Sequence, residues 1–290
     1  MSYGFIRDHV ASFPIQLMCA VLEVSRSGYY DWLRRPESAH ATADRVLSGE
    51  IRAVHQDSHG RYGSPRVHAA LRAHGRRIGR KRVARLMRGM GLSARRKRRF
   101  RRTTDSAHRY PVAPNLLGRA FQAAAPDRVW LADITYLWTA EGWLYLAVVM
   151  DLFSRRIVGW AMADRLGHEL ALAALEMAIA RQHPAPGLIH HSDRGVQYAA
   201  HNYRKRLHQH GMICSMSRKG DCWDNAPMES FFATLKGELV EMADYLTRDQ
   251  ARADVFQYIE GFYNRRRLHS GIGYLTPEQK AECAAAASAA

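Results

Sequence analysis

Three acidic residues have the types and the spacing that phosphodiester chemistry requires. Asp133 lies inside an apolar stretch, Asp193 follows another, and 35 residues separate Asp193 from Glu229. Hydrolysis or transfer of a phosphodiester needs an activated water or 3′-hydroxyl and a stabilised leaving oxygen, which two Mg²⁺ ions about 3.5–4 Å apart can supply. Mg²⁺ takes hard oxygen ligands and keeps several waters, so a few carboxylates suffice. The three residues therefore predict a metal-dependent nuclease or strand transferase.

Each carboxylate falls on a different expected element. Asp133 lies in the middle of a strand predicted over 129–137, and Asp193 follows a short strand predicted over 187–191. The pattern also predicts strands over 143–151, 157–163 and 212–217, and helices over 168–182, 199–210 and 226–242. This order indicates an α/β domain with a mixed five-stranded sheet flanked by helices. The three carboxylates can converge at one end of such a sheet.

The helix predicted over 226–242 combines a buried stripe with a functional flank. Its apolar residues share one side at 100° per residue: Met228, Phe231, Phe232, Leu235 and Leu239. Glu229 and Lys236 lie together at the edge of this stripe, which suits Glu229 as a metal ligand and Lys236 as a contact for DNA phosphate or a base. Asn225 is expected to be the N-cap. A glutamate early in a helix also suits the helix dipole alone, which is the plainer interpretation of Glu229.

Two alternative assignments compete with this site. The run His190–Asp193 has the residue types of a hydrolase triad, but adjacent residues of an extended chain point to opposite faces, and no Gly-x-Ser-x-Gly motif is present. Glu238 and Glu241 are interpreted as solvated helix charges. Glu238 is the substitute ligand if Glu229 is not one.

The composition favours a polyanionic partner. The chain has 290 residues, 47% of them hydrophobic, and a net charge of +16 with a pI near 10.1. Nucleic acid is the first candidate and a membrane surface the second. No apolar run approaches the ~20 residues that span a bilayer, so we expect a soluble cytoplasmic protein without an export signal. The four cysteines form no CxxC pair, which argues against a zinc site or a disulfide framework.

Positive charge is concentrated between Arg76 and Arg102, where 14 of 27 residues are Lys or Arg and none is acidic. Ser64 and Pro65 are expected to cap and begin one helix, which Gly75 ends. A second helix carries apolar residues at helical spacing, at Val83, Leu86, Met87 and Met90. The pair is typical of a helix-turn-helix with a recognition helix, although a solvated helical hairpin has the same pattern.

The basic residues are interpreted as DNA contacts. Those on the second helix are Arg80, Lys81, Arg82, Arg85 and Arg88. A basic arm for phosphates follows over 95–102, with Arg95, Arg96, Lys97, Arg98 and Arg99. Arginine runs of this kind contribute affinity and little sequence readout.

The chain is expected to divide into five parts. They are an N-terminal helical segment (1–48), the helix-turn-helix-like region with its basic arm (49–102), a proline-punctuated linker (103–127), the catalytic core (128–245), and a C-terminal helical extension with an Ala-rich tail (246–290).

Three motifs together are specific to one family. The stretches Trp130–Tyr136, His191–Tyr198 and Asn225–Phe232, the last followed by Leu235 and Lys236, resemble the catalytic core of insertion-sequence transposases of the insertion sequence three family. The likeness is to the product of its second reading frame (OrfB). It extends to further motifs and covers nearly the whole chain: Ser25–Tyr30, Tyr62–Leu92, Tyr263–Asn264, His269 and Thr276–Pro277.

The resemblance implies a ribonuclease H-like fold of the retroviral integrase superfamily, preceded by an all-helical, helix-turn-helix-like DNA-binding domain. It implies that Asp133, Asp193 and Glu229 are the catalytic, metal-binding residues of a DDE transposase, with two Mg²⁺ ions for which Mn²⁺ can substitute. The expected reaction is strand cleavage at element ends, followed by attack of the freed 3′-hydroxyl on another phosphodiester, through a circular DNA intermediate. The sequence lacks the N-terminal His/Cys zinc module of retroviral integrases.

The expected partners are DNA, at the terminal inverted repeats and at the target, and further copies of the chain on DNA. A further partner is the product of an upstream reading frame (OrfA), as a separate protein or a fusion. The expected location is the bacterial cytoplasm, at the nucleoid. Two other functions stay open: a catalytically inactive DNA-binding regulator derived from a transposase, and a nuclease that cuts RNA in hybrids.

Overall fold

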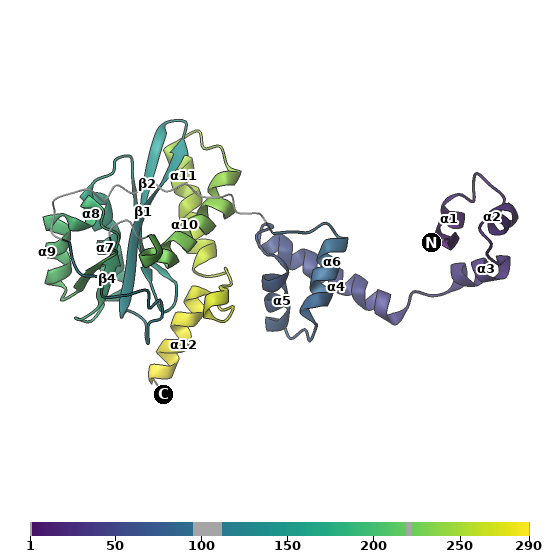
Figure 1. The fold of residues 1–290 in the computed structure, drawn as a ribbon, viewed down its shortest axis with the longest axis horizontal. Coiled ribbons are helices and arrows are strands. Elements are labelled where there is room, and N and C mark those ends of the chain that lie inside the picture. The colour runs from purple at the N-terminus through teal and green to yellow at the C-terminus, as the bar shows by residue number, and fades with distance from the viewer. Residues whose placement is uncertain (1, 95–111, 219–221, 290) are drawn as a thin grey trace.

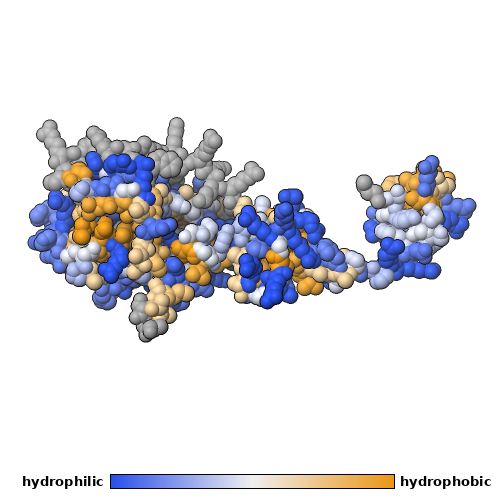
Figure 2. Space-filling model, turned by 60° about the horizontal axis from the view of Figure 1, so that its bottom comes forward, coloured by the Kyte–Doolittle hydropathy of each residue, from blue (hydrophilic) through white to orange (hydrophobic). Residues whose placement is uncertain are grey.

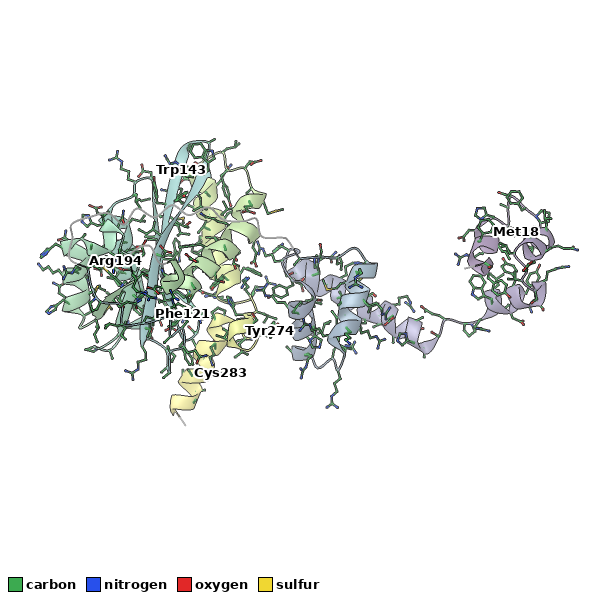
Figure 3. All side chains as sticks on the ribbon, viewed as in Figure 1. Met18, Phe121, Trp143, Arg194, Tyr274 and Cys283 are labelled. Atoms are coloured by element: carbon green, nitrogen blue, oxygen red, sulfur yellow. The ribbon has the colours of Figure 1, made fainter. Side chains whose placement is uncertain are left out.

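The computed structural model describes residues 2–94, 112–218 and 222–289. Three short helices come first, α1 (Ser2–Asp8), α2 (Ile15–Val21) and α3 (Arg26–Arg34). They form a small unit of their own around Ile6 and Met18, and Met18 lies inside it in Figure 3. Ser25 caps α3, because its Oγ accepts a hydrogen bond from Gly28 N at 3.0 Å. Figure 1 shows this unit apart from the rest, and Figure 2 shows a hydrophilic stretch between them.

The predicted helix-turn-helix is present as three packed helices, α4 (Ala39–Asp57), α5 (Ser64–Ala73) and α6 (Arg80–Gly89). Val67 of α5 and Val83 and Met87 of α6 are buried together, which confirms the expected apolar stripe. The predicted cap is wrong by one residue, because Gly63 is the N-cap and Ser64 already belongs to the helix. Pro65 lies in the first turn, where its missing N–H costs nothing.

The mixed five-stranded sheet is confirmed, with the order β3-β2-β1-β4-β5. Its strands are β1 (Val129–Thr139), β2 (Gly142–Asp151), β3 (Ile157–Ala163), β4 (Ile189–Ser192) and β5 (Ile213–Met216). β1, β2 and β3 are antiparallel neighbours, whereas β4 runs parallel to both β1 and β5. A strand with neighbours on both sides and helices on both faces must be apolar nearly throughout, as β1 and β2 are.

Two helical layers cover the sheet (Figure 1). On one face, Trp130 and Ala132 pack against α7 (His168–Gln182), α8 (Val196–Ala199) and α9 (His201–Gln209). On the other, Leu131 packs in the cluster that contains α10 (Ala226–Glu238). The helix predicted over 199–210 is α9, which begins at His201 and ends at Gln209, and the short α8 precedes it. Gly159 lets β3 approach α7, because a Cβ there would collide with the Ala174 backbone.

The C-terminal region wraps the second face. The short turn η1 (Cys222–Asn225) precedes α10, and after α10 come η2 (Val240–Met242), α11 (Arg248–Phe256), the π-helical η3 (Gln257–Tyr263), η4 (Ser270–Ile272) and α12 (Pro277–Ala289). The single helix predicted over 226–242 is wrong at its end, since α10 stops at Glu238 and Leu239 leaves helical geometry. In the described residues, every helix is too short or too polar to cross a bilayer.

The helix-turn-helix docks on this C-terminal region. Tyr62 Oη donates a hydrogen bond to the Arg266 carbonyl (2.8 Å) and accepts one from Leu268 N (2.9 Å). Arg66 Nε donates to the Leu268 carbonyl (2.9 Å). Tyr274 lies where the two regions face each other in Figure 3. One hydrophobic cluster runs through both regions, so the helix-turn-helix is packed against the catalytic half.

Candidate active site

The sheet register brings two of the three carboxylates together. Ala132 of β1 and Ser192 of β4 are the last paired residues of this parallel pair, so Asp133 and Asp193 are the next in line on adjacent strands. Asp193 turns the chain away from the sheet, and its Oδ1 accepts a hydrogen bond from Gly195 N (2.9 Å). By strand alternation Asp133 shares the face of Leu131, which is the face that α10 covers.

α10 supplies the third carboxylate. Its buried stripe is the predicted one, with Met228, Phe231, Phe232 and Leu235 inside. Glu229 is exposed and Lys236 is half-buried on the neighbouring flank. The Lys236 ammonium lies 4.8 Å from the centroid of the Tyr136 ring of β1, so this flank faces the strand that carries Asp133.

The electrostatics link the three carboxylates. Burial raises the pKa of Asp133 well above its usual value, and the charge of Asp193 is the next cause. Glu229 raises the same pKa less strongly, and Lys236 lowers it. Burial lowers the pKa of the Lys236 ammonium, which the charge of Asp133 partly offsets. Asp133 and Asp193 therefore form the inner pair, with Glu229 and Lys236 at its margin.

Carboxylate oxygens are hard donors, and the negative charge of these carboxylates exceeds the positive charge beside them. The site therefore suits a divalent cation. Within the described ranges, however, no three His, Cys, Asp or Glu side chains are already close enough to enclose a metal ion. Glu229 has a weaker effect than Asp193 on the pKa of Asp133. The donor set fits Mg²⁺ in chemistry.

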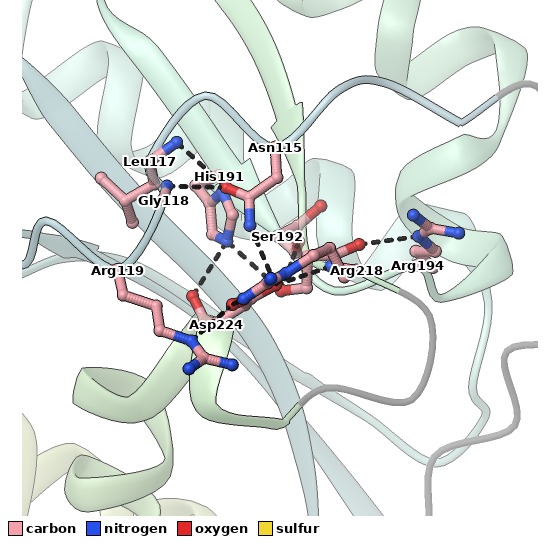
Figure 4. A network of polar contacts seen from close by, with 10 residues as sticks. Asn115, Leu117, Gly118, Arg119, His191, Ser192, Arg194, Arg218 and Asp224 are labelled. Atoms are coloured by element: carbon pink, nitrogen blue, oxygen red, sulfur yellow. Dashed lines mark hydrogen bonds and ion pairs between the residues drawn. The ribbon is translucent and has the colours of Figure 1, made fainter.

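A polar network fixes the start of α10 (Figure 4). Its centre is Asp224, which is fully buried. Asp224 accepts hydrogen bonds from Arg218 Nη2 (2.9 Å), Arg119 Nε (3.1 Å) and Asn115 Nδ2 (2.9 Å). The hydrogen bonds from Arg218 are the main cause that holds the pKa of Asp224 well below its usual value. The motifs of the sequence did not single out this residue, although an acid between a basic loop and a helix start was a signal for it.

Asn225 joins the same network to the site. It stands at the N-cap position, but its side chain does not cap the helix as predicted. Instead, Asn225 Nδ2 donates to the carbonyl of Ala132 (3.3 Å), the residue before Asp133. Within the described residues, Asn225 Oδ1 is buried without a hydrogen-bond partner. The first turn of α10 is thus tied to the strand beside the carboxylate.

The histidines of the run 190–193 are structural. His191 Nδ1 bonds Ser215 Oγ (2.8 Å), and His191 Nε2 lies 3.1 Å from the Asp224 carbonyl. His190 Nε2 bonds the hydroxyl of Tyr203 (2.9 Å). Burial lowers the pKa of His190 to about 3, so its ring is neutral. These contacts leave no Ser–His–Asp relay in this run.

Glu238 is not a solvated charge, which corrects the prediction. It is buried and accepts hydrogen bonds from Arg267 Nη2 (2.7 Å) and Tyr258 Oη (2.8 Å). Burial opposes ionisation of Glu238, but the guanidinium of Arg267 holds its pKa below the usual value. A glutamate that is committed to this pair is no substitute for Glu229.

The predicted DNA contacts differ in their surroundings. Arg82 Nε and Arg85 Nη2 make ion pairs with Asp44 of α4, at 2.7 Å and 2.5 Å. The other basic positions on α6 are exposed: Arg80, Lys81 and Arg88. The predicted arm residues lie outside the described residues: Arg95, Arg96, Lys97, Arg98 and Arg99.

Matches to known protein families agree with this architecture. Two integrase core domain families match residues 123–222 and 210–277, and an HTH-like domain family matches residues 42–100. Among solved structures, a simian T-cell lymphotropic virus intasome bound to a PP2A regulatory subunit aligns with a TM-score of 0.47 and 17% identity, over 80% of this chain and 74% of that one. The HTLV-2 integrase catalytic core in complex with magnesium aligns with a TM-score of 0.41 and 14% identity, over 55% and 98%.

Full-length relatives are more similar. The uncharacterized 31 kDa protein of insertion element IS600 from Shigella sonnei is 48% identical over 260 residues, which is 90% of this chain and 96% of that protein. The transposase InsF for insertion sequence IS3A from Escherichia coli (strain K12) is 45% identical over 281 residues, 96% of this chain and 98% of that protein. With an integrase core, a helix-turn-helix and relatives of this identity along nearly its whole length, the chain belongs to the IS3 family of transposases.

Proposed function

We propose that Asp133, Asp193 and Glu229 form the site with which this transposase cuts DNA strands at the ends of its element and joins the freed 3′-hydroxyl to another phosphodiester. The observation that carries the proposal is the β1–β4 register, in which Asp133 and Asp193 are the next residues in line after the last pair. The mutual effect of the carboxylates on the pKa of Asp133 supports it.

The proposed cofactor is Mg²⁺, with Mn²⁺ as a substitute. Asp133, Asp193 and Glu229 would hold two ions, because carboxylate oxygens are the ligands that Mg²⁺ prefers. Bound metal ions would supply an activated water or 3′-hydroxyl and stabilise the leaving oxygen. Burial and then the charge of Asp193 raise the pKa of Asp133, and a bound cation would offset both causes because it favours the ionised carboxylates.

The surrounding residues would orient the DNA and the ligands. Lys236 stands on the flank of Glu229 and would bind a backbone phosphate as a compact cation while the Tyr136 ring holds its ammonium in place. Asp224 and Asn225 would keep the first turn of α10 against β1, and with it the position of Glu229. Such support is needed because a misplaced ligand costs rate even when its chemistry is unchanged.

Recognition of the terminal inverted repeats would fall to the helix-turn-helix. The exposed basic residues of α6 suit phosphates and base edges in a major groove. Transposition joins two element ends, so we propose a multimer on DNA, with or without the product of an upstream reading frame. The intact carboxylate set argues against an inactive regulator.

A cleavage assay tests the site. Labelled element-end DNA is incubated with Mg²⁺ and the wild-type protein, Asp193→Asn, or Asp164→Asn. Asp193→Asn is expected to lose cleavage and strand transfer by at least about 10³-fold, because a neutral amide is a poor Mg²⁺ ligand. Asp164→Asn is the matched control, since Asp164 is exposed beyond the end of β3. Equal activity in wild type and Asp193→Asn would remove the proposed metal site.

A further inference from the structure

A cluster of basic side chains lies on a side of α10 that faces away from Glu229. A cavity of about 470 Å³ opens where α5, the turn between β2 and β3 and the C-terminal segment meet the start of α10. Three arginines and a histidine from three parts of the chain line it: Arg66, Arg155, Arg267 and His269. Ser230 and Thr234 of α10 line it as well. At 100° per residue they lie roughly 100° and 140° around the helix from Glu229, so the cavity is distinct from the carboxylate site.

The positive charge of this cavity is only partly balanced. Arg267 is paired with Glu238. Arg66 Nε donates to the Leu268 carbonyl (2.9 Å) and Arg155 Nη2 to the Phe121 carbonyl (2.9 Å). Among the described residues, no carboxylate lies within ion-pair distance of either Arg66 or Arg155. Backbone carbonyls orient these two guanidinium groups without neutralising them.

The partial burial of these groups makes the imbalance costly. Burial is the first cause that lowers the pKa of Arg66, and the charge of Arg267 is the second. Burial, then the charges of Arg267, Arg66 and Arg155, lower the pKa of His269 to about 2. His269 is therefore neutral. Its Nε2 lies 3.3 Å from Arg267 Nη1, which can only donate, so Nδ1 carries the ring proton and is a further donor.

We propose that this cavity binds a phosphate group, and that in the DNA complex the group is a backbone phosphodiester away from the scissile one. Guanidinium groups match phosphate oxygens in pairs, and the hydroxyls of Ser230 and Thr234 add neutral donors. Because Arg66 belongs to the helix-turn-helix and Arg155 to the catalytic half, one bound phosphate would hold the two regions together. The assignment of this phosphate to DNA rests on the proposed function, whereas the anion site itself does not depend on it.

Binding of inorganic phosphate tests the site without DNA. The Tm of the full chain is measured in sodium phosphate against sodium chloride of equal ionic strength. The wild-type Tm is expected to rise with phosphate concentration, as for any ligand of the folded state. Arg66→Gln and Arg155→Gln are expected to lose this rise, whereas Arg72→Gln, an exposed arginine of α5, keeps it. No rise in the wild type, or the same rise in all four proteins, overturns the site.

A second pair of variants guards against loss of structure. Ser270 is exposed and lines the cavity. Ser270→Asp puts a fixed negative charge beside the arginines and is expected to abolish the phosphate effect, while Ser270→Asn, of similar size, retains it. Retention of the phosphate effect in Ser270→Asp contradicts the proposal.

The salt dependence of duplex binding tests whether the phosphate belongs to DNA. The slope of log Kobs against log salt is expected to fall in magnitude by about 0.9 in Arg155→Gln, the value for one phosphate that the protein no longer neutralises. An unchanged slope in a variant that no longer binds inorganic phosphate shows a site for a free anion and overturns the DNA assignment. Neither the phosphate test nor the duplex-binding test requires catalysis. Both can therefore be interpreted even if the cleavage assay contradicts the proposed carboxylate site.

Discussion

The fold disfavours the charged form of the Asp133 carboxyl. Burial and then Asp193 raise its pKa in the folded protein, so the folded protein holds the proton more tightly than the unfolded chain does. Stability from this group is therefore complete at low pH and is lost as the pH rises from the unfolded pKa through the folded one. Without metal, ionisation of Asp133 therefore costs the fold stability.

Replacement of Asp133 is expected to raise the stability of the metal-free protein and to abolish its activity. We expect Asp133→Asn to have a higher Tm than the wild type at neutral pH in EDTA, and to lack strand cleavage. Mg²⁺ should raise the wild-type Tm and leave that of Asp133→Asn unchanged, because the variant has lost a ligand. Calorimetry of both proteins with and without Mg²⁺ checks this, with Asp164→Asn as the control. If the Tm of Asp133→Asn in EDTA is at or below that of the wild type, the Asp133 carboxyl does not destabilise the metal-free fold.

Local patterns reveal some site residues and conceal others. The elements that carry Asp133 and Glu229 were predictable, because Asp133 lies inside an apolar strand-like run and Glu229 lies at the edge of an apolar stripe of period 3.6. The local signal for Asp224 is weaker, because only Arg218 is near it in the sequence, whereas Asn115 and Arg119 are more than a hundred residues away. The burial of Glu238 depends in the same way on Arg267, which belongs to a segment without a periodic signal.

α10 is the element that carries Glu229, and both of its ends are anchored. Asp224 precedes its first turn, and Glu238 is its last residue. The Glu238–Arg267 pair explains why the helix ends four residues before the predicted position, since Glu238 must turn inward toward Arg267 while Leu239 departs from helical geometry. The sequence pattern predicts a longer helix, because the spacing of the apolar residues stays helical past Glu238.

The N-terminal anchor should affect the use of metal. We expect Asp224→Asn to lower the cleavage rate by about 10-fold and to raise the Mg²⁺ concentration for half-maximal activity, because Glu229 is held less firmly. The lowered pKa of Asp224 stabilises the fold above its unfolded pKa, near 3.8, and this stability is lost only as the pH falls through the folded value. The loss of Tm should thus be constant from about pH 5 to about pH 8. An unchanged Mg²⁺ requirement would reduce Asp224 to a purely structural role.

The C-terminal anchor should matter for stability. Glu238→Gln leaves the guanidinium of Arg267 buried without its counter-charge, and loss of one partner of a buried pair costs about 3–5 kcal/mol. Urea unfolding of Glu238→Gln against Glu241→Gln measures this, because Glu241 is exposed and its replacement should stay within about 0.5 kcal/mol. Equal free energies of unfolding in the two variants would show that solvent or another group compensates Arg267.

At the scale of the whole molecule, the order of the regions was predictable and their docking was not. The alternation of apolar strands and amphipathic helices indicated the mixed sheet flanked by helices, and the basic helix pair indicated the helix-turn-helix. The contact between them depends on Tyr62 and on backbone groups of the segment 266–268, which lies about two hundred residues further along the chain. Backbone groups at an irregular segment leave no side-chain pattern, so only the folded chain reveals that the helix-turn-helix rests on the catalytic half.

The basic residues of α6 allow a specific test of DNA binding, because some are exposed and others are paired with Asp44. Replacement of Arg80, Lys81 and Arg88 by alanine should weaken duplex binding and lower the magnitude of the salt slope by about 0.9 for each phosphate that the protein no longer neutralises. Replacement of Arg82 and Arg85 should have a smaller effect on the slope and a larger one on Tm, because Asp44 already neutralises these two. Fluorescence anisotropy over a salt series, with Tm measured on the same proteins, distinguishes the sets. If both sets change the slope equally, Asp44 releases its arginines to DNA, and if neither does, α6 is not the recognition helix.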